Sequence, residues 1–161
     1  DFPKVKEVHN RTFNNWGEAE LVRLLRESEA FVSDLSIVAE QNNELIGHVL
    51  FSKIRLIEND IDLKGLSLAP IAVIPEMQKN GVGRALIVEG IKRAKGLGFW
   101  SILVLGDPKY YAKFGFRNEL TKNIRSRYAC KEFAGLELID ESLSKLTEAD
   151  AIYPDAFSVV D

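Results

Sequence analysis

Residues 66–95 read LSLAPIAVIPEMQKNGVGRALIVEGIKRAK, a strand, a glycine-containing turn and an amphipathic helix in that order. The run from Leu66 to Ile74 is almost entirely apolar, which is typical of a strand buried on both faces. Proline has no N–H to donate, so Pro70 inside this run predicts a bulge or a local loss of strand pairing. The helix is expected from about Gly83 to Lys95, with Gly96 and Gly98 as its stop.

A second buried strand is expected directly after this helix. Phe99 to Leu105 is a nearly continuous apolar run bounded by Gly106-Asp107-Pro108. Strand, helix and strand in this order predict a right-handed parallel crossover. Lys109 to Phe114 then predicts a short helix closed by Gly115.

The sequence before residue 66 predicts two helices and a hairpin. Apolar spacing indicates one helix opening with Asp1 as N-cap and a second across Glu18 to Glu29. From Ile37 to Glu40 and from Glu44 to Phe51 the pattern is that of strands, separated by the turn residues Gln41-Asn42-Asn43. The chain is therefore predicted to be a mixed α/β (α+β) protein, with a mostly antiparallel sheet, a central β-α-β crossover and a splay between its two middle strands.

Length and composition limit the domain count and the kind of partner. A chain of 161 residues with 46% hydrophobic content fits one domain, 1–161, with one or two further strands near Gly135 to Leu138. A formal charge of only -3, with both signs interspersed, favours neither nucleic acid nor a membrane surface as partner. One cysteine, two histidines and no long apolar run lead us to expect a cytoplasmic protein without a metal site.

The turn Gln78-Lys79-Asn80-Gly81-Val82-Gly83-Arg84-Ala85 has the chemistry of a phosphate cradle. Its glycines allow close backbone approach, and the first N–H groups of a helix point outwards as donors for an anion. Lys79 and Arg84 add positive charge. The turn lacks the Gly-Lys-Ser/Thr end of a Walker loop and the third glycine of a dinucleotide fingerprint, and an ordinary strand-to-helix turn would also fit.

Two motifs in the right order resemble the GNAT superfamily of N-acetyltransferases. Gln78-x-x-Gly81-x-Gly83 is similar to its acetyl-coenzyme A motif, and Tyr111-Ala112-Lys113-Phe114-Gly115-Phe116 is similar to its Tyr-x-x-x-Gly-Phe signature. The resemblance covers Ile37 to Phe116 well and the tail poorly. Family members commonly begin with a short strand, whereas this sequence opens on a helix. Either that strand is missing from the sequence or an early element is replaced, and an edge of the sheet could then be left open.

The resemblance implies that acetyl-CoA is a co-substrate and that its acetyl group passes directly to a primary amine of a small molecule or a protein. The pantetheine arm would pair with the strand beyond Pro70 like an added strand, and its diphosphate would bind the turn. The implied cofactor-binding residues are Ile71, Ala72, Val73, Gln78, Lys79, Asn80, Gly81, Val82, Gly83, Arg84 and Ala85.

Tyr111 matches the tyrosine that typically protonates the departing thiolate in the family, although it could instead only pack the short helix on the sheet. Some members use a glutamate as base, but its counterpart here is near Ser67, which cannot accept the proton. A water chain ending on Glu40, Glu76 or His48, or direct attack by the free amine, are the alternatives. His48 also reads as an ordinary strand histidine.

Two other functions fit the same residues. A non-catalytic acetyl-CoA-binding sensor would keep the cradle without turnover, and a binder of another nucleotide would use the cradle alone. The identity of the amine acceptor is not encoded in any recognisable motif, because acceptor clefts are built from loops and the tail. A sheet edge near the C-terminus leaves a homodimer open.

Overall fold

A computed structural model describes residues 2–13 and 15–161. Within it the chain forms two compact units. The first consists of Asp1–Ser52, Ala69–Arg93 and Pro154–Asp161, and the second of Lys53–Leu68 and Ala94–Tyr153. The single domain over residues 1–161 stays a prediction.

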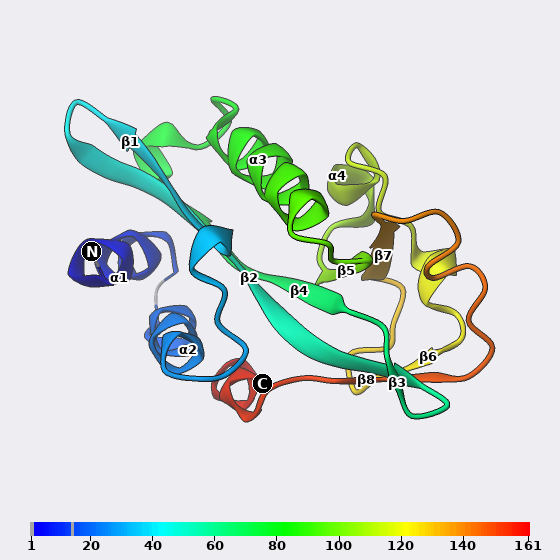
Figure 1. Cartoon of the computed structure of the whole chain (residues 1–161). Helices are drawn as coiled ribbons and strands as arrows, with labels where there is room; N and C mark the ends of the chain where they lie inside the picture. Colours follow the sequence, from blue (N-terminus) through cyan, green and yellow to red (C-terminus); the bar gives the residue numbers. More distant parts are fainter. Residues whose placement is uncertain (1, 14) are drawn as a thin grey trace. The chain divides into compact units, whose positions relative to one another are not determined.

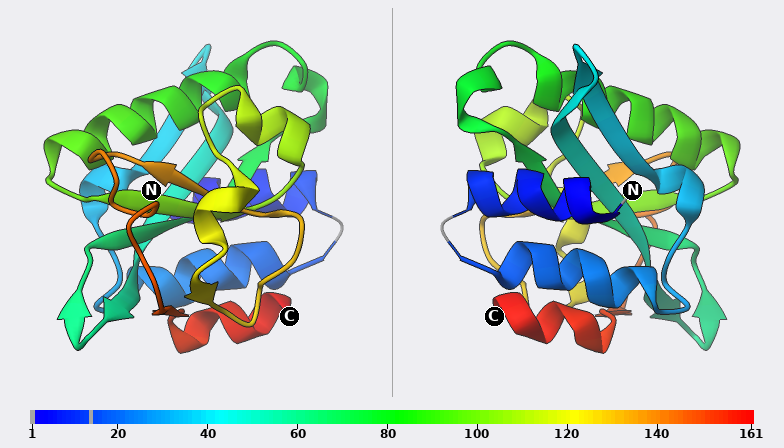
Figure 2. Two further views of the ribbon diagram at one scale, coloured as in Figure 1. Left: turned by 90° about the vertical axis from the view of Figure 1, so that its right-hand side faces the viewer. Right: turned by 90° about the vertical axis from the view of Figure 1, so that its left-hand side faces the viewer.

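Two amphipathic helices open the first unit. Helix α1 spans Phe2–Thr12 and α2 spans Gly17–Arg26, which confirms both predicted helices; the proposed N-cap Asp1 lies outside the described residues. They contact each other, and α2 also contacts the C-terminal 3₁₀ helix η4 (Asp155–Val160), so that the three lie side by side in Figure 2. Their inward faces are apolar, with Val5, Val8, Leu21, Val22 and Leu25 all buried.

An antiparallel hairpin of β1 (Ser36–Gln41) and β2 (Glu44–Glu58) follows, as predicted (Figure 1). Its turn residues Asn42 and Asn43 have φ values of 53° and 66°, the left-handed conformation that a two-residue hairpin turn requires and that asparagine tolerates. Strand β2 continues well past Phe51, where the prediction ends. The extension alternates exposed and buried residues, which is the period of a strand with one covered face.

Helix α3 (Val82–Gly96) confirms the predicted helix, and its N-terminal part lies in the first unit. Ile87 is fully buried on it. A Cβ added at Gly90 would lie 2.0 Å from the ring of Phe51, so only a glycine lets this helix approach β2 so closely. This contact therefore fixes the distance between α3 and β2.

The second unit contains most of the sheet. Its strand order is β6-β8-β2-β4-β5-β7, and β3 pairs with β2. The remaining strands are β3 (Ile61–Asp62), β4 (Gly65–Val73), β5 (Ser101–Leu105), β6 (Ile124–Arg125), β7 (Phe133–Glu137) and β8 (Ala149–Ile152). Of the short helices, η1 (Ser33–Leu35) and η2 (Pro75–Met77) lie in the first unit, and α4 (Pro108–Ala112) and η3 (Asn118–Thr121) lie in the second.

Strands β4 and β5 are parallel, which confirms the predicted crossover. Their register comprises only Gly65↔Ser101, Leu66↔Ile102 and Ser67↔Leu103. On its other edge β5 pairs with β7 along its whole length, Ser101–Leu105, so Val104 and Leu105 have a partner in β7 but none in β4. The ladder on the β4 side thus ends before the cis Ala69–Pro70 peptide bond, in agreement with the loss of pairing that Pro70 predicts.

The tail contributes more strands than its sequence pattern indicates. Strand β7 confirms the strand expected near Gly135, whereas β6 and β8 form a second parallel pair that the pattern does not reveal. Together with β2, β5 and the loops around them they enclose one apolar cluster: Ile54, Leu56, Leu103, Leu120, Ile124, Phe133, Leu143, Leu146, Ala149 and Ala151. Among the described residues, no helix has the length and apolar content needed to cross a membrane.

Candidate functional site

The turn between β4 and α3 lies entirely in the first unit and is tightly folded. The Met77 N–H donates to the Ile74 carbonyl at 2.9 Å within η2. Beyond it, Lys79 (φ 64°) and Gly81 (φ 83°) adopt left-handed conformations. Left-handed residues interspersed with ordinary ones turn successive N–H groups towards one side, which is the geometry of a backbone anion site.

The backbone N–H groups of residues 79–84 donate to no acceptor in the described part of the chain. The first helical hydrogen bond at this end runs from the Ala85 N–H to the Gly81 carbonyl at 3.0 Å. Neither Lys79 nor Arg84 forms an ion pair with another described residue, and both side chains are exposed. A helix N-terminus with free donors and two flanking cations attracts an anion.

Gly47 of β2 sets the position of this helix N-terminus. A Cβ there would lie 3.1 Å from side-chain carbons of both Val82 and Leu86 and 3.3 Å from the Ala72 carbonyl oxygen. The first turn of α3 therefore rests on the backbone of β2 beside β4. This contact brings the predicted residues Ala72 and Val82 together.

The end of β4 presents backbone groups on its outer edge. The Ile74 N–H donates to the Ile46 carbonyl at 2.9 Å, and residues of an antiparallel pair point alternately towards and away from the partner strand. Ile71 and Val73 therefore direct their N–H and C=O groups away from β2. Ala72 packs instead into a buried cluster with Val8, Ile46 and Ile74.

Two side chains donate to the outward carbonyl of Val73. The Gln78 side-chain amide lies 2.9 Å from it, and the Thr12 hydroxyl lies 3.1 Å from it. Gln78 is a predicted site residue, but its amide reaches back to the strand. Sequence reasoning missed Thr12, although its place on the same helical stripe as Val5 and Val8 indicates that it faces the sheet.

Tyr111 lies in the second unit, on α4. The Asp107 side chain caps this helix by accepting from the Lys109 N–H, and a Cβ at Gly106 would lie 2.4 Å from the Tyr111 ring. Phe116 packs edge-on against the ring with centroids 5.7 Å apart. The ring is therefore held by the glycine, the cap and the Phe116 of its own signature.

The Tyr111 hydroxyl makes no hydrogen bond with another described residue. Burial, with a smaller effect of neighbouring Tyr110, raises the pKa of Tyr111 to about 12. The phenol is thus protonated throughout the physiological range. It has a proton to donate and no internal acceptor for it among the described residues.

The proposed proton acceptors differ in their surroundings. His48 is fully buried, and its Nδ1 lies 2.9 Å from the Nε2 of His9, a partner that sequence reasoning missed. Burial lowers the pKa of His48 to about 3.

The other candidate acceptors are carboxylates, and Glu76 forms an ion pair with Arg11. Ser67, at the position of the family's glutamate, is buried and hydrogen-bonded to Tyr153. Glu40 is exposed on β1.

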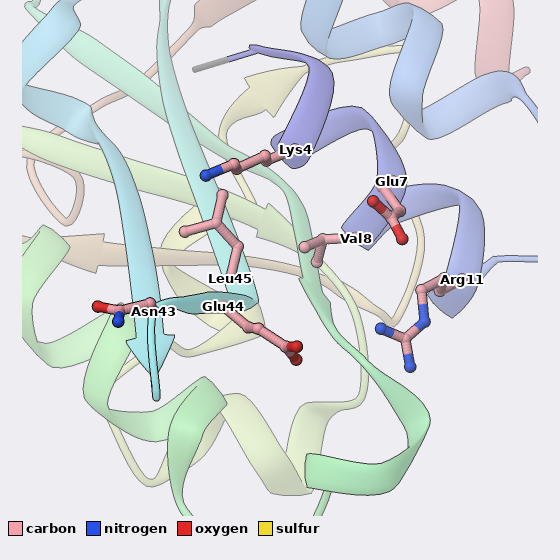
Figure 3. Close-up of a pocket in the computed structure, with 7 residues that line it drawn as sticks. All are labelled: Lys4, Glu7, Val8, Arg11, Asn43, Glu44 and Leu45. Atoms are coloured by element: carbon pink, nitrogen blue, oxygen red, sulfur yellow. The ribbon is translucent and has the colours of Figure 1, made fainter.

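A surface groove of about 250 Å³ lies between α1 and the β1–β2 hairpin of the first unit. Figure 3 shows that α1 contributes Lys4, Glu7, Val8 and Arg11, and that the hairpin contributes Asn43, Glu44 and Leu45. Its lining has both charge signs, and its Arg11 is engaged by Glu76. We assign it no ligand. The described residues contain no cluster of three or more potential metal ligands.

Residues 2–116 match a family model, the Acetyltransferase (GNAT) family. The uncharacterized N-acetyltransferase YjhQ of Escherichia coli (strain K12) is 39% identical over 117 residues, which cover 72% of this chain and 64% of YjhQ. The chain thus spans less than two thirds of that relative. The uncharacterized N-acetyltransferase YhbS of the same strain is 30% identical over 149 residues, 91% of this chain and 87% of YhbS.

Two solved structures are similar over almost the whole chain. YhbS from Escherichia coli in complex with CoA has a TM-score of 0.87 at 30% identity, covering 98% of this chain and 87% of that chain. A GNAT family acetyltransferase from Brucella melitensis in complex with acetyl-CoA has a TM-score of 0.77 at 28% identity, covering 98% of this chain and 92% of that one.

Proposed function

Because the chain belongs to the Acetyltransferase (GNAT) family, as the match over residues 2–116 shows, we propose that it is an acetyl-CoA-dependent N-acetyltransferase. It moves the acetyl group by direct transfer to a primary amine of a small molecule or a protein. The family resemblance and the mixed, mostly antiparallel fold predicted from the sequence are confirmed by this match and by the TM-score of 0.87. A cytoplasmic location and a homodimer remain predictions.

The observation that carries this proposal is the row of N–H groups at residues 79–84, which have no acceptor among the described residues. A diphosphate has negatively charged oxygens that can accept hydrogen bonds from these N–H groups. Two solved relatives of the same fold carry CoA or acetyl-CoA. The diphosphate of acetyl-CoA is therefore the ligand we assign to the turn.

The pantetheine arm is proposed to lie along the outer edge of β4. Its amides match the outward N–H and C=O groups of Ile71 and Val73 in the way an added strand would. An outward N–H of the same edge then polarises the thioester carbonyl. One donor of this kind contributes ~2.7 to 4 kcal/mol to acyl transfer.

Tyr111 is proposed as the acid that protonates the departing sulfur. The pKa of about 12 for the buried phenol is well above the usual thiol value of about 8.5, so proton transfer to a thiolate of ordinary basicity is uphill. Burial disfavours both anions, however, and a thiolate leaving in a desolvated site is also more basic than in solution. The support for Tyr111 is its place in the family signature, its buried ring and its unpaired hydroxyl.

The amine is proposed to attack as the small free fraction. For an amine with pKa about 10.4, freeing it at pH 7 costs ~4.6 kcal/mol. His48 is a poor sink for that proton, because burial keeps its imidazole neutral with a pKa of about 3. The rate should therefore rise with pH towards the pKa of the acceptor amine.

The test is the release of CoA thiol from acetyl-CoA across a panel of primary amines, including polyamines and lysine-containing peptides. Tyr111→Phe should lower kcat by ~100-fold or more, since it removes the acid, and leave KM for acetyl-CoA within about 3-fold. Tyr110→Phe is the matched control on the same helix and should keep the wild-type kcat.

Binding of acetyl-CoA without thiol release by any amine would contradict the transferase and favour the sensor. Equal rates for the wild type and Tyr111→Phe would overturn the role of Tyr111 alone. In that case the leaving thiolate departs without a protein acid.

A further inference from the structure

The side chain of Gln78 stands where a ligand amide is needed. Its Nε2 lies 2.9 Å from the Val73 carbonyl oxygen, on the edge of β4 that turns away from β2. We infer that Gln78 is a placeholder, which satisfies this carbonyl in the free protein and yields it to an amide N–H of pantetheine when CoA binds. The inference rests on the proposed function, since it specifies how that site recognises its co-substrate.

Thr12 competes only weakly for the same carbonyl. Its hydroxyl has a single proton and two acceptors, the Val8 carbonyl at 2.8 Å and the Val73 carbonyl at 3.1 Å. The nearer acceptor is the ordinary one for a threonine in a helix, four residues back. Gln78 is therefore the principal donor to Val73.

Val73 needs a donor because its carbonyl has no strand partner on that side. The β4–β5 register ends at Ser67, and the Ile74 N–H is already engaged by Ile46. A buried or half-buried carbonyl without a donor is unfavourable, so the free protein must supply one. Gln78 does so from the first position of the phosphate-binding turn.

The exchange is easy because both released groups have other partners. Gln78 is exposed, so its amide passes to water. Thr12 keeps its bond to Val8. Pantetheine thus replaces one amide by another at Val73, and the same movement frees a donor next to the anion site. A ligand without pantetheine leaves Gln78 in place.

The experiment compares the affinities of the full chain for CoA and for ADP, which has a diphosphate but no pantetheine, by calorimetry. Gln78→Ala should raise the preference for CoA over ADP by about 2- to 10-fold, because it removes an intramolecular competitor worth one hydrogen bond. ADP leaves Gln78 on the Val73 carbonyl, so it is the reference ligand that binds the turn without the exchange. Thr12→Val should change the ratio by less than about 2-fold.

A second measurement follows the Gln78 side-chain amide directly by NMR. The sequence contains only one other glutamine, Gln41, which serves as the internal reference. CoA should move the Gln78 amide resonances to the position of a solvated amide, and ADP should leave them where they are in the free protein.

An unchanged or reduced CoA preference in Gln78→Ala, or a Gln78 amide that CoA does not move, would overturn the placeholder while leaving the proposed function intact. Failure of the wild type to bind CoA would instead remove the proposed function, and the placeholder with it.

Discussion

Among single residues, the two histidines show how burial changes a pKa. His9 and His48 are almost completely buried, 2.9 Å apart, and His48 also lies 2.9 Å from the Ser36 hydroxyl. Burial lowers the pKa of His9 from 6.5 to about 4 and that of His48 to about 3, the latter with smaller contributions from His9 and Arg26. Both imidazoles are therefore neutral in the folded protein.

Because both histidines are neutral in the folded protein, we predict that its free energy of unfolding decreases in mild acid. Below pH 6.5 the histidines of the unfolded chain bind protons, whereas those of the folded chain do not. The stability that the neutral pair contributes is therefore fully present above pH 6.5, and it is lost as the pH falls towards the folded pKa values of about 4 for His9 and about 3 for His48. The loss approaches about 1.4 kcal/mol per pH unit for each histidine. Urea unfolding between pH 7 and pH 5 measures it, in a range where ordinary carboxylates hardly titrate.

The matched control is the double variant His9→Leu/His48→Leu, which removes both titrating groups. Its stability should be nearly flat between pH 7 and pH 5. A wild type with the same flat profile would show that the pair does accept a proton in the folded state.

At this scale the sequence identifies residues by motif and misses those that act through contacts. Gly81 and Tyr111 stand at fixed motif positions, and Gly81 has the left-handed backbone expected of a glycine turn. Thr12 and His9 lie on α1, and their hydrogen-bond partners are known only once α1 is packed on β2 and β4. Their contacts join residues more than 30 positions apart, a distance over which no local pattern carries information.

Among the elements, α3 shows how one glycine sets the separation of a helix and a strand. A Cβ at Gly90 would lie 2.0 Å from Cε1 and 2.3 Å from Cζ of Phe51. Gly90→Ala should destabilise the protein by about 1 to 3 kcal/mol, because the helix or the ring must shift to make room. Thermal or urea unfolding measures the change.

Gly96 in the same helix provides the control. An added Cβ there meets nothing within 4 Å, so Gly96→Ala should be neutral or stabilise by up to about 1 kcal/mol through helix propensity. If both variants lost the same stability, the loss would come from the helix backbone and not from the contact with Phe51.

Elements with a strong period are predicted well, and very short ones are not. Helix α3, the hairpin and β5 appear where apolar spacing and turn residues place them. Strands β6 and β8 are too short to show alternation, and they exist because the cluster around Leu103 and Phe133 covers them. Their pairing is a tertiary effect, and the sequence pattern carries no sign of it.

On the scale of the whole molecule, three of the four boundaries between the two units fall inside β2, β4 and α3. Neither unit is therefore a continuous stretch of chain. We predict that both unfold in one cooperative transition, which is the meaning of a single domain over residues 1–161.

Each unit contains one of the two tryptophans, Trp16 in the first and Trp100 in the second. Trp16→Phe leaves fluorescence to report on the second unit, and Trp100→Phe leaves it to report on the first. In each variant the fluorescence midpoint in urea should coincide with the midpoint from far-UV circular dichroism. Midpoints that separate in either variant would mean that the units unfold independently and that the chain is not one domain.

The backbone donors at residues 79–84 also affect how the protein should be handled. Amide hydrogens recognise negative oxygen and not a particular molecule, so sulfate or inorganic phosphate from a purification buffer can settle where a diphosphate belongs. High ionic strength further screens Lys79 and Arg84. Any affinity measured for this turn is thus a property of the buffer as much as of the polypeptide, and dilute, oxyanion-free solutions will give the strongest binding.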